Sequence, residues 1–269
     1  MRSGVIAEGV LWLLAAGLFV LGADFGARDI GAFEPSMRDA NVMRLVTWNV
    51  GGAENGVPHS MKEEHVPAIA DALARLDADL VFVQELVDGA QLRRLADALG
   101  RDWTAWRGRG DCGVLTRRSD VERWGPRRVR NHAGVLWPRD GRDLVVLALH
   151  ADAFSAKERN EAIGESHAAL MAQAGHAHVL LGDLNLDVDQ DKKSELFSDD
   201  LHADVESYNV LAATLTDAAL GKGPTAEPDR RLDYVFVSRE LEIVAAGPWF
   251  GRRVGTMDHH PVVVDLRWR

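Results

Sequence analysis

The sequence predicts an α/β fold in which mixed β-sheets and helices form a layered domain. Short runs rich in β-branched and apolar residues, typical of strands, alternate with segments whose apolar residues have helical spacing. Several strand runs follow one another with no helix between them, so the strict alternation of a purely parallel sheet does not fit. This pattern begins at Met43 and continues to the C-terminus without an internal repeat.

The first element is a strand at residues 44–50, which Gly51 and Gly52 end. Residues 66–76 carry apolar side chains three and four positions apart, as the buried face of a helix requires. Further helices are expected at residues 91–99 and 156–174. Further strands are expected at residues 79–84, 112–116, 134–137, 144–150, 178–182, 234–237, 241–246 and 261–266.

The N-terminal part of the chain is separate in character. Residues 10–23 are an uncharged, mostly apolar run, shorter than the ~20 residues of a spanning helix. A signal peptide or membrane anchor, a buried or peripheral helix, and a start codon at Met43 are all compatible with it. We divide the chain into residues 1–42, a hydrophobic segment with a linker, and a domain of residues 43–269. We expect export or membrane anchoring, or a cytoplasmic location if the segment is not a targeting signal.

Charge and cysteine content exclude some classes of function. The net charge is −10, from 31 basic and 41 acidic residues, which argues against a protein that coats nucleic acid by bulk attraction. It does not exclude an enzyme that brings divalent cations to a phosphate ester. The single cysteine, Cys112, excludes an internal disulfide and a cysteine-based zinc cluster. Residues 101–142 hold 11 arginines and 5 acidic residues, which form either a solvated face or a patch that holds phosphates.

Polar residues stand at the ends of the strongest apolar strands, where open α/β sheets place their ligand sites. Taken singly, each of them is typical of a turn. Together they fit the hydrolysis of a phosphate ester, because carboxylates are hard ligands for Mg²⁺ or Mn²⁺ and a histidine with a carboxylate partner can activate water. These residues are Asn49, Glu85, His150, Asp183, Asn185, Asp233, Asp258 and His259.

Several motifs around these residues resemble the endonuclease/exonuclease/phosphatase superfamily. The motifs are VTWNV, VFVQEL, LALH, LLGDLNLD, RRLDYVFVS and DHHPVVVDL. The resemblance extends from Met43 to the C-terminus. It implies a four-layer α/β sandwich with two packed mixed β-sheets and outer helices, and a metal-dependent phosphoesterase with Mg²⁺ or Mn²⁺ as its cofactor.

The resemblance also implies roles for single residues. Glu85 matches the metal-binding glutamate, Asp258 resembles the aspartate on the metal side, and Asn49 stands near the metal and the phosphate. The other roles concern the reaction itself. Asp183 and Asn185 match the pair that positions the nucleophile and phosphate.

The two histidines have separate implied roles. His150 matches a residue that contacts the scissile phosphate or acts as acid. His259 resembles the general base, and Asp233 resembles the carboxylate that orients it.

Three functions fit these features. The first is a phosphodiesterase with nuclease activity, favoured by His150 and by the arginine-rich stretch. The second is a lipid or small-molecule phosphodiesterase or phosphatase similar to sphingomyelinases, with membrane association through residues 10–23. The third is a catalytically inactive binding protein on the same fold. We expect nucleic acid as the partner and a monomeric protein.

Overall fold

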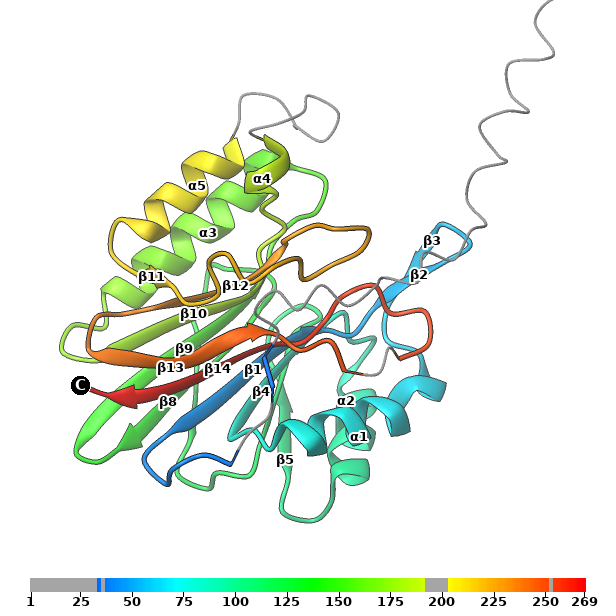
Figure 1. Cartoon of the computed structure of the whole chain (residues 1–269), viewed down its shortest axis with the longest axis horizontal. Coiled ribbons are helices and arrows are strands. Elements are labelled where there is room, and N and C mark those ends of the chain that lie inside the picture. The colour runs from blue at the N-terminus through cyan, green and yellow to red at the C-terminus, as the bar shows by residue number, and fades with distance from the viewer. Residues whose placement is uncertain (1–32, 35–36, 192–202, 252–253) are drawn as a thin grey trace, which may run out of the picture. The chain divides into compact units, whose positions relative to one another are not determined.

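Two six-stranded mixed β-sheets and a short hairpin form the strands of the computed structural model (Figure 1). The first sheet has the order β13-β14-β1-β4-β6-β5, with strands Leu241–Pro248, Val262–Trp268, Met43–Asn49, Leu80–Gln84, Gly113–Thr116 and Thr104–Arg107. The second has the order β11-β12-β10-β9-β8-β7, with strands Thr216–Asp217, Asp233–Val237, Ala177–Asp183, Arg142–His150, His132–Arg139 and Glu122–Trp124. The hairpin pairs β2 (Gly52–Glu54) with β3 (Val57–His59).

The structure describes residues 33–34, 37–191, 203–251 and 254–269. The hydrophobic segment predicted at residues 10–23 lies outside them. None of the helices in the described part of the chain is long and apolar enough to cross a membrane. Phe33 is buried, and its amide donates a hydrogen bond of 2.8 Å to the carbonyl of Pro248 at the end of β13.

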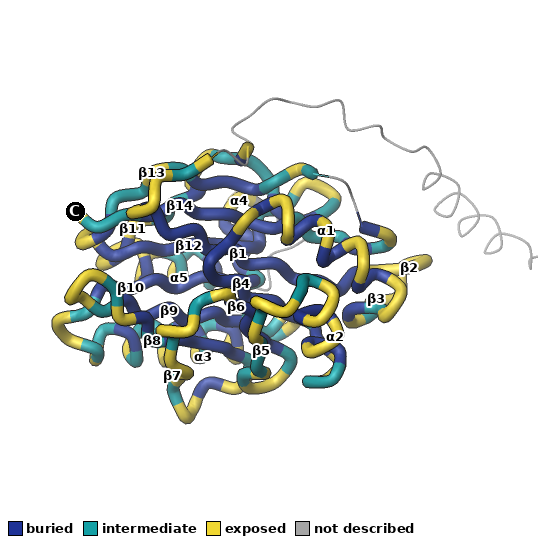
Figure 2. Tube along the Cα trace, turned by 90° about the horizontal axis from the view of Figure 1, so that it is seen from below, coloured by how far each residue is buried: buried dark blue, intermediate teal, exposed yellow. Residues whose placement is uncertain are grey.

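The two sheets pack face to face, because each presents one side of its alternating residues to the other. Leu45 and Phe82 of the first sheet share one buried cluster with Val146 and Leu181 of the second. These strands are buried over nearly their whole length, and the exposed residues gather on the helices and loops (Figure 2).

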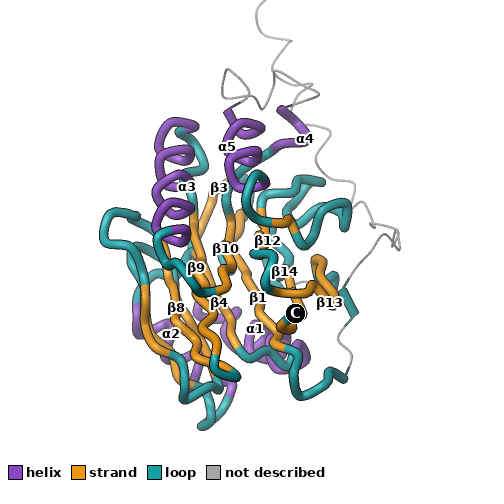
Figure 3. Tube along the Cα trace, turned by 90° about the vertical axis from the view of Figure 1, so that its left-hand side faces the viewer, coloured by secondary structure: helices purple, strands orange, loops and turns teal. Residues whose placement is uncertain are grey.

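Helices cover the outer faces of both sheets (Figures 1 and 3). Alternate residues of β1 and β4, such as Val46 and Val81, pack with α1 (Val66–Leu76) and α2 (Gly89–Leu99). On the second sheet, α3 (Ala156–Met171) and α5 (Ala203–Ala212) pack on the outward residues of β9, β10 and β12. The short helices are η1 (Glu63–His65) and α4 (Val188–Asp191). The order helix, sheet, sheet, helix confirms the four-layer sandwich.

Some elements escaped the sequence analysis for a common reason. The edge strands β5, β7 and β11 are short and half-exposed, so they lack the run of apolar residues that predicts a strand. Helix α5 buries Asp204 and Ser207 beside Leu211, a set that shows no apolar stripe. The helix expected at residues 156–174 ends at Met171.

Strand register gathers the predicted site residues at one end of both sheets. In the second sheet, Asp183 pairs with His150 on parallel β9 and with Asp233 on antiparallel β12. In the first sheet, Asn49 pairs with Gln84, the last residue of parallel β4. The carboxyl ends of β1, β4, β9 and β10 therefore form one edge, as the rule for open α/β sheets predicts.

A buried ion pair at the opposite end of the first sheet gives a test of the packing. Arg44 donates to both carboxylate oxygens of Asp265, at 2.7 and 2.8 Å, and both side chains are buried. Replacing Asp265 by alanine is expected to cost about 3–5 kcal/mol, because a buried guanidinium loses its bidentate partner. Urea unfolding monitored by circular dichroism measures this loss.

The matched control for this prediction joins β14 to its other neighbour, β13. Glu242 accepts two hydrogen bonds of 2.8 Å from Arg267, but this pair is exposed to solvent. Glu242→Ala should leave the unfolding midpoint nearly unchanged. If both variants lost the same free energy of unfolding, burial could not be the reason why the Asp265 pair matters more.

Candidate active site

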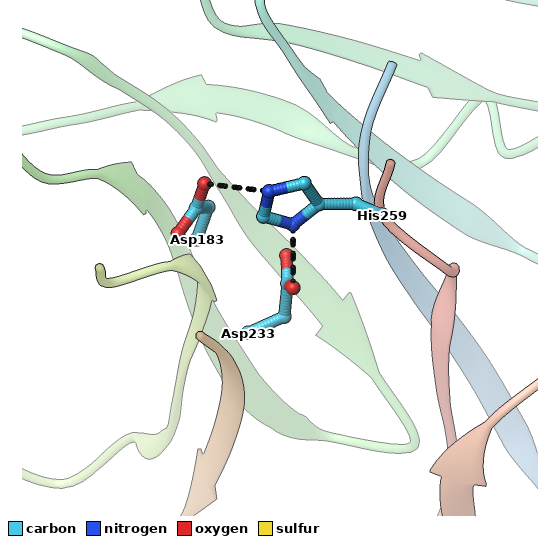
Figure 4. A group of neighbouring side chains, drawn as sticks. All are labelled: Asp183, Asp233 and His259. Atoms are coloured by element: carbon cyan, nitrogen blue, oxygen red, sulfur yellow. Dashed lines mark hydrogen bonds and ion pairs between the residues drawn. The ribbon is translucent and has the colours of Figure 1, made fainter. Parts of the chain in front are cut away.

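Two histidine–aspartate pairs face a common carboxylate at the edge where the strands end. The Nδ1 atom of His259 donates to Oδ2 of Asp233 at 2.8 Å, and that of His150 donates to Oδ2 of Asp111 at 2.8 Å. The Nε2 atom of each imidazole lies 3.8 Å from the same atom, Oδ2 of Asp183 (Figure 4 shows the His259 side). Two imidazoles that meet at one point can serve as base and acid on the two sides of a reacting group.

The first sheet contributes an amide and a carboxylate to the same point. The Nδ2 atom of Asn49 donates to Oδ2 of Asp183 at 3.0 Å and to Oε1 of Glu85 at 2.9 Å. Its Oδ1 atom accepts from the amide of Gly51 at 3.0 Å, which fixes the orientation of the side chain. Asn49 thus connects Glu85 and Asp183, which are 98 positions apart in sequence and belong to facing sheets.

Two residues of the site have a strained backbone conformation. Glu85 has φ 64° and Asn185 has φ 49°, both in the left-handed region that side chains disfavour. A Cβ at Gly51 would lie 1.7 Å from Oε2 of Glu85, so only glycine leaves room for this carboxylate. In this conformation, the side-chain Nδ2 of Asn185 donates to the carbonyl of Ala151 at 3.0 Å, and the backbone amide of Asn185 donates to Oδ1 of Asp183 at 3.0 Å.

The carboxylates of the site keep both imidazoles protonated well above neutral pH when no cation is bound. Burial lowers the pKa of His150, but the hydrogen bond to Asp111 and the neighbouring carboxylates outweigh burial and raise it to about 9. Burial likewise lowers the pKa of His259, but the charges of Asp233 and Asp183 raise it to about 10. A divalent cation in the site would lower both pKa values by repulsion.

Glu85 is the residue best suited to hold that cation. Burial raises the pKa of its carboxyl group. The hydrogen bond that the described residues give this carboxylate comes from a neutral amide, that of Asn49. A half-buried carboxylate whose hydrogen bond comes from a neutral amide fits an oxygen ligand for a divalent cation.

A second set of donors could also hold a metal ion. The ligand atoms of Asp183, Asp233 and His259 lie within 4.8 Å of one another (Figure 4). In this set, Nδ1 of His259 and Oδ2 of Asp233 are joined by a hydrogen bond, whereas Oδ1 of Asp233 makes none. A cation held by Glu85 would leave the hydrogen bond between His259 and Asp233 intact.

Asp258 is placed beside the site. Its charge contributes to the raised pKa of His259, and its backbone carbonyl accepts from the amide of Glu227 at 2.8 Å. Within the described residues its carboxylate makes no hydrogen bond to Glu85 or Asn49. The metal-ligand role of Asp258 stays a prediction.

Asp111 is the site residue that the sequence analysis missed. It lies in the loop between β5 and β6 and is joined to His150 across two sheets. The available signal was its place directly before an apolar strand, since the other site acids also stand at strand ends. Asp111 lacks a recognisable motif, so its function is visible only through its contact.

Replacing Asp111 by asparagine is expected to change the pH dependence of turnover. Burial lowers the pKa of His150, and the hydrogen bond and charge of Asp111 raise it together with the charges of Asp183 and Glu85, so the loss of Asp111 should lower this pKa. If His150 acts as the acid, the rate should begin to fall at lower pH than in the unmodified protein. A profile of kcat against pH measures this shift. Asp143→Asn is the control, because Asp143 pairs with His176 at the opposite end of β9.

A model of the endonuclease/exonuclease/phosphatase family matches residues 46–251. The chain belongs to this family. As a member of the endonuclease/exonuclease/phosphatase family it is a hydrolase of phosphate esters, which confirms the coarse part of the predicted function. The matched segment includes seven of the residues considered above, Asn49, Glu85, Asp111, His150, Asp183, Asn185 and Asp233, and ends before Asp258 and His259.

Solved structures of other endonuclease/exonuclease/phosphatase proteins share this fold. A family member from Bacteroides thetaiotaomicron has a TM-score of 0.62 at 17% identity, and the alignment covers 88% of this chain and 100% of that one. D. rerio TDP2, solved with a single strand DNA product, has a TM-score of 0.62 at 18% identity, covering 85% and 100%. The B. thetaiotaomicron mannosyl-6-phosphatase Bt3783 has a TM-score of 0.60 at 18% identity, covering 84% and 100%. A comparison with curated proteins gives no match.

Proposed function

We propose that this protein is a divalent-metal-dependent phosphodiesterase that cleaves nucleic acid, with His259 as the general base. The observation that carries the proposal is the pair of His259 and Asp233, joined at 2.8 Å beside Asp183 and opposite a second histidine. A buried aspartate on Nδ1 orients an imidazole so that Nε2 can accept a proton. This is the arrangement that activation of water requires.

The reaction follows from these positions. Nε2 of His259 takes a proton from water as the water oxygen forms its bond to phosphorus. The bond from phosphorus to the leaving oxygen breaks, and Nε2 of His150 donates the proton that this oxygen needs. The products are a phosphomonoester and an alcohol. Nδ2 of Asn185 has a second hydrogen that can be donated to a phosphate oxygen without adding charge. Asn49 positions Asp183 and Glu85 beside the phosphate, and Asp183 stands between the two imidazoles.

A bound cation supplies one further effect. Glu85 would hold Mg²⁺ or Mn²⁺, with Asn49 and Asp258 as the other residues on the metal side, and the ion would offset the negative charge that develops on the phosphate. The donor set supports a hard cation of this kind, because the side chains offer oxygen ligands and the nearby imidazoles are committed to Asp111 and Asp233.

Activity on four substrates tests the proposal: plasmid DNA, RNA, sphingomyelin and bis-p-nitrophenyl phosphate, each with Mg²⁺ and with EDTA. We expect Mg²⁺-dependent cleavage of a nucleic acid and of the small diester. Cleavage of sphingomyelin alone would favour the lipid phosphodiesterase, and inertness on all four would favour a binding protein. The fold shared with D. rerio TDP2, which was solved with a DNA product, supports testing nucleic acid first.

We also propose that the protein is a monomer that is exported or anchored in a membrane through residues 10–23. The uncharged run in that segment supports this. Fractionation of cells that express the full chain tests it. Recovery of all the uncleaved protein in the soluble fraction would contradict the anchor.

A further inference from the structure

Ten of the eleven arginines of residues 101–142 fall into two groups in the structure, and the eleventh, Arg101, is exposed and precedes β5. Five of them lie over tryptophan rings at 4.3–5.5 Å from the ring centroid: Arg117, Arg118, Arg123, Arg139 and Arg142. Another five are exposed and form no ion pair with a carboxylate of the described residues: Arg107, Arg109, Arg127, Arg128 and Arg130. We call this second group the arginine surface. The first group has a structural role, whereas the second leaves its charge open to solvent.

The arginine surface lies beside the active site because its two loops contact His150. The loop of residues 108–112 contains Asp111, which binds Nδ1 of His150. The loop of residues 125–131 ends at Asn131, whose carbonyl accepts from the amide of His150 at 3.0 Å. The arginines are therefore one to four residues from groups that hold a histidine of the site.

Close packing holds these two loops together. The amide of Arg109 donates to the carbonyl of His132 at 2.7 Å, and its guanidinium donates to the carbonyl of Arg127. A Cβ at Gly110 would lie 2.0 Å from Oδ1 of Asn131, so glycine is needed for this approach. Val129 is buried in the cluster under α3, which leaves its neighbours on either side exposed. The charges are thus carried on anchored loops.

An aromatic side chain stands on the next loop along. Phe154 is 91% exposed, four residues after His150. Oδ1 of Asp152 accepts from the amides of Phe154 and Ser155, at 2.8 and 2.6 Å, so the backbone that presents the ring is fixed. Burying this ring in the core would have been favourable, and its exposure next to a reaction site suggests a partner.

We propose that the arginine surface and Phe154 bind a single-stranded polynucleotide and lead it to the active site. The guanidiniums bind successive phosphates, and Phe154 stacks on an unpaired base. This inference rests on the proposed function and names the form of its substrate. Stacking on a side chain needs a base that is not paired in a duplex, which favours a single strand.

The same surface fits a lipid membrane less well. Binding to a membrane surface depends on buried apolar area in addition to basic charge. The two arginine loops expose no large apolar side chain among their described residues, and Phe154 is a single exposed ring on the loop that follows His150. A chain of phosphates with bases is the partner that matches this composition.

Fluorescence anisotropy of a fluorescein-labelled single-stranded 20-mer tests the proposal with the full-length protein in EDTA. The test variant is Arg128→Gln with Arg130→Gln, two exposed side chains in the second arginine loop. The slope of log Kd against log salt concentration should fall by about 0.7 for each phosphate that is no longer neutralised, or about 1.4 in this variant. Phe154→Ala should weaken binding about fivefold or more, with the salt slope unchanged.

The control variant removes two arginines from the opposite end of the sheets, Arg101→Gln with Arg239→Gln. Arg101 precedes β5 and Arg239 follows β12, whereas the site lies at the other ends of these strands. This variant should bind like the unmodified protein. An unchanged slope after loss of Arg128 and Arg130 would overturn the proposal. Arginine-dependent binding to phosphatidylglycerol vesicles without binding to the 20-mer would also overturn it.

Hydrolysis of bis-p-nitrophenyl phosphate separates this inference from the proposed function. That diester is too small to need the arginine surface, so its turnover should be the same in the Arg128→Gln, Arg130→Gln variant. Normal diester turnover, together with 20-mer binding that is unchanged by the loss of Arg128 and Arg130, would refute this inference but not the proposed function. If the unmodified protein hydrolyses no diester, the proposed function is refuted. The anisotropy measurements in EDTA would still test whether the arginine surface binds the 20-mer.

Discussion

Replacing His259 by alanine is expected to lower kcat for bis-p-nitrophenyl phosphate by about 10²–10⁴-fold, the usual cost of losing a general base. The substitution also leaves the buried carboxylate of Asp233 without its imidazole partner, so some stability should be lost, and the rates are compared only at temperatures where the variant is folded. Initial rates with saturating Mg²⁺ measure the fall in kcat, and circular dichroism checks the fold. His176→Ala is the control, since His176 pairs with Asp143 at the far end of β9. A rate near that of the unmodified protein would remove His259 from the mechanism.

Asp233→Asn keeps His259 but removes the carboxylate that orients it, so this variant tests the role of the orientation. The charge and hydrogen bond of Asp233 raise the pKa of His259, so the variant should have a lower pKa there. The base then loses its proton at lower pH, and the rising part of the rate profile should move in that direction. The maximal rate should fall as well, because the imidazole is no longer held with Nε2 toward the site. A profile that keeps its midpoint would contradict the pairing.

Replacing Glu85 by glutamine is expected to lower the rate by about 10²-fold or more. A catalytic cation contributes several kcal/mol of charge stabilisation, and each 1.36 kcal/mol is a factor of ten in rate. Raising the Mg²⁺ concentration should recover part of the rate if weakened binding causes the loss. Glu64→Gln, an exposed glutamate on η1, is the matched control. Full activity at low Mg²⁺ in the Glu85 variant would exclude this residue as the ligand.

Although Glu85→Gln should lower the rate, it should raise the thermal stability of the cation-free protein. Burial raises the pKa of Glu85 above its value in the unfolded chain, so the ionised carboxylate destabilises the fold at neutral pH. A neutral amide of the same shape removes this cost and should raise the Tm without Mg²⁺. The increase in Tm that Mg²⁺ gives the unmodified protein should disappear. A lower Tm in EDTA would show that Glu85 is structural.

Local sequence patterns were sufficient for much of the fold. Strands β1, β4, β9 and β10 have long apolar runs because both of their faces are buried, one against the other sheet and one against helices. Such runs are visible without tertiary information. Strand β5 and helix α5 were not predicted, since half-exposed edges and short helices carry little periodic signal.

The site was predictable where its residues stand at the ends of those strands. The resemblance to the family singled out Asn49, Glu85, Asp183 and His259, and the strand register explains why they share one edge. Asp111 could not be predicted, because its role comes from one hydrogen bond to a strand of the other sheet.

The sequence by itself determined the layered α/β class and the polar residues at the strand ends, because apolar runs and strand ends are properties of short segments. The resemblance of its motifs to the family implied the sandwich and the roles of the site residues. The tertiary structure alone decided which carboxylate holds which imidazole and which arginines keep their charge open to solvent. Those choices depend on distances between residues far apart in the chain, such as the 2.8 Å from His150 to Asp111. Hydrogen bonds and ion pairs act only at such short range, so composition and spacing do not encode them.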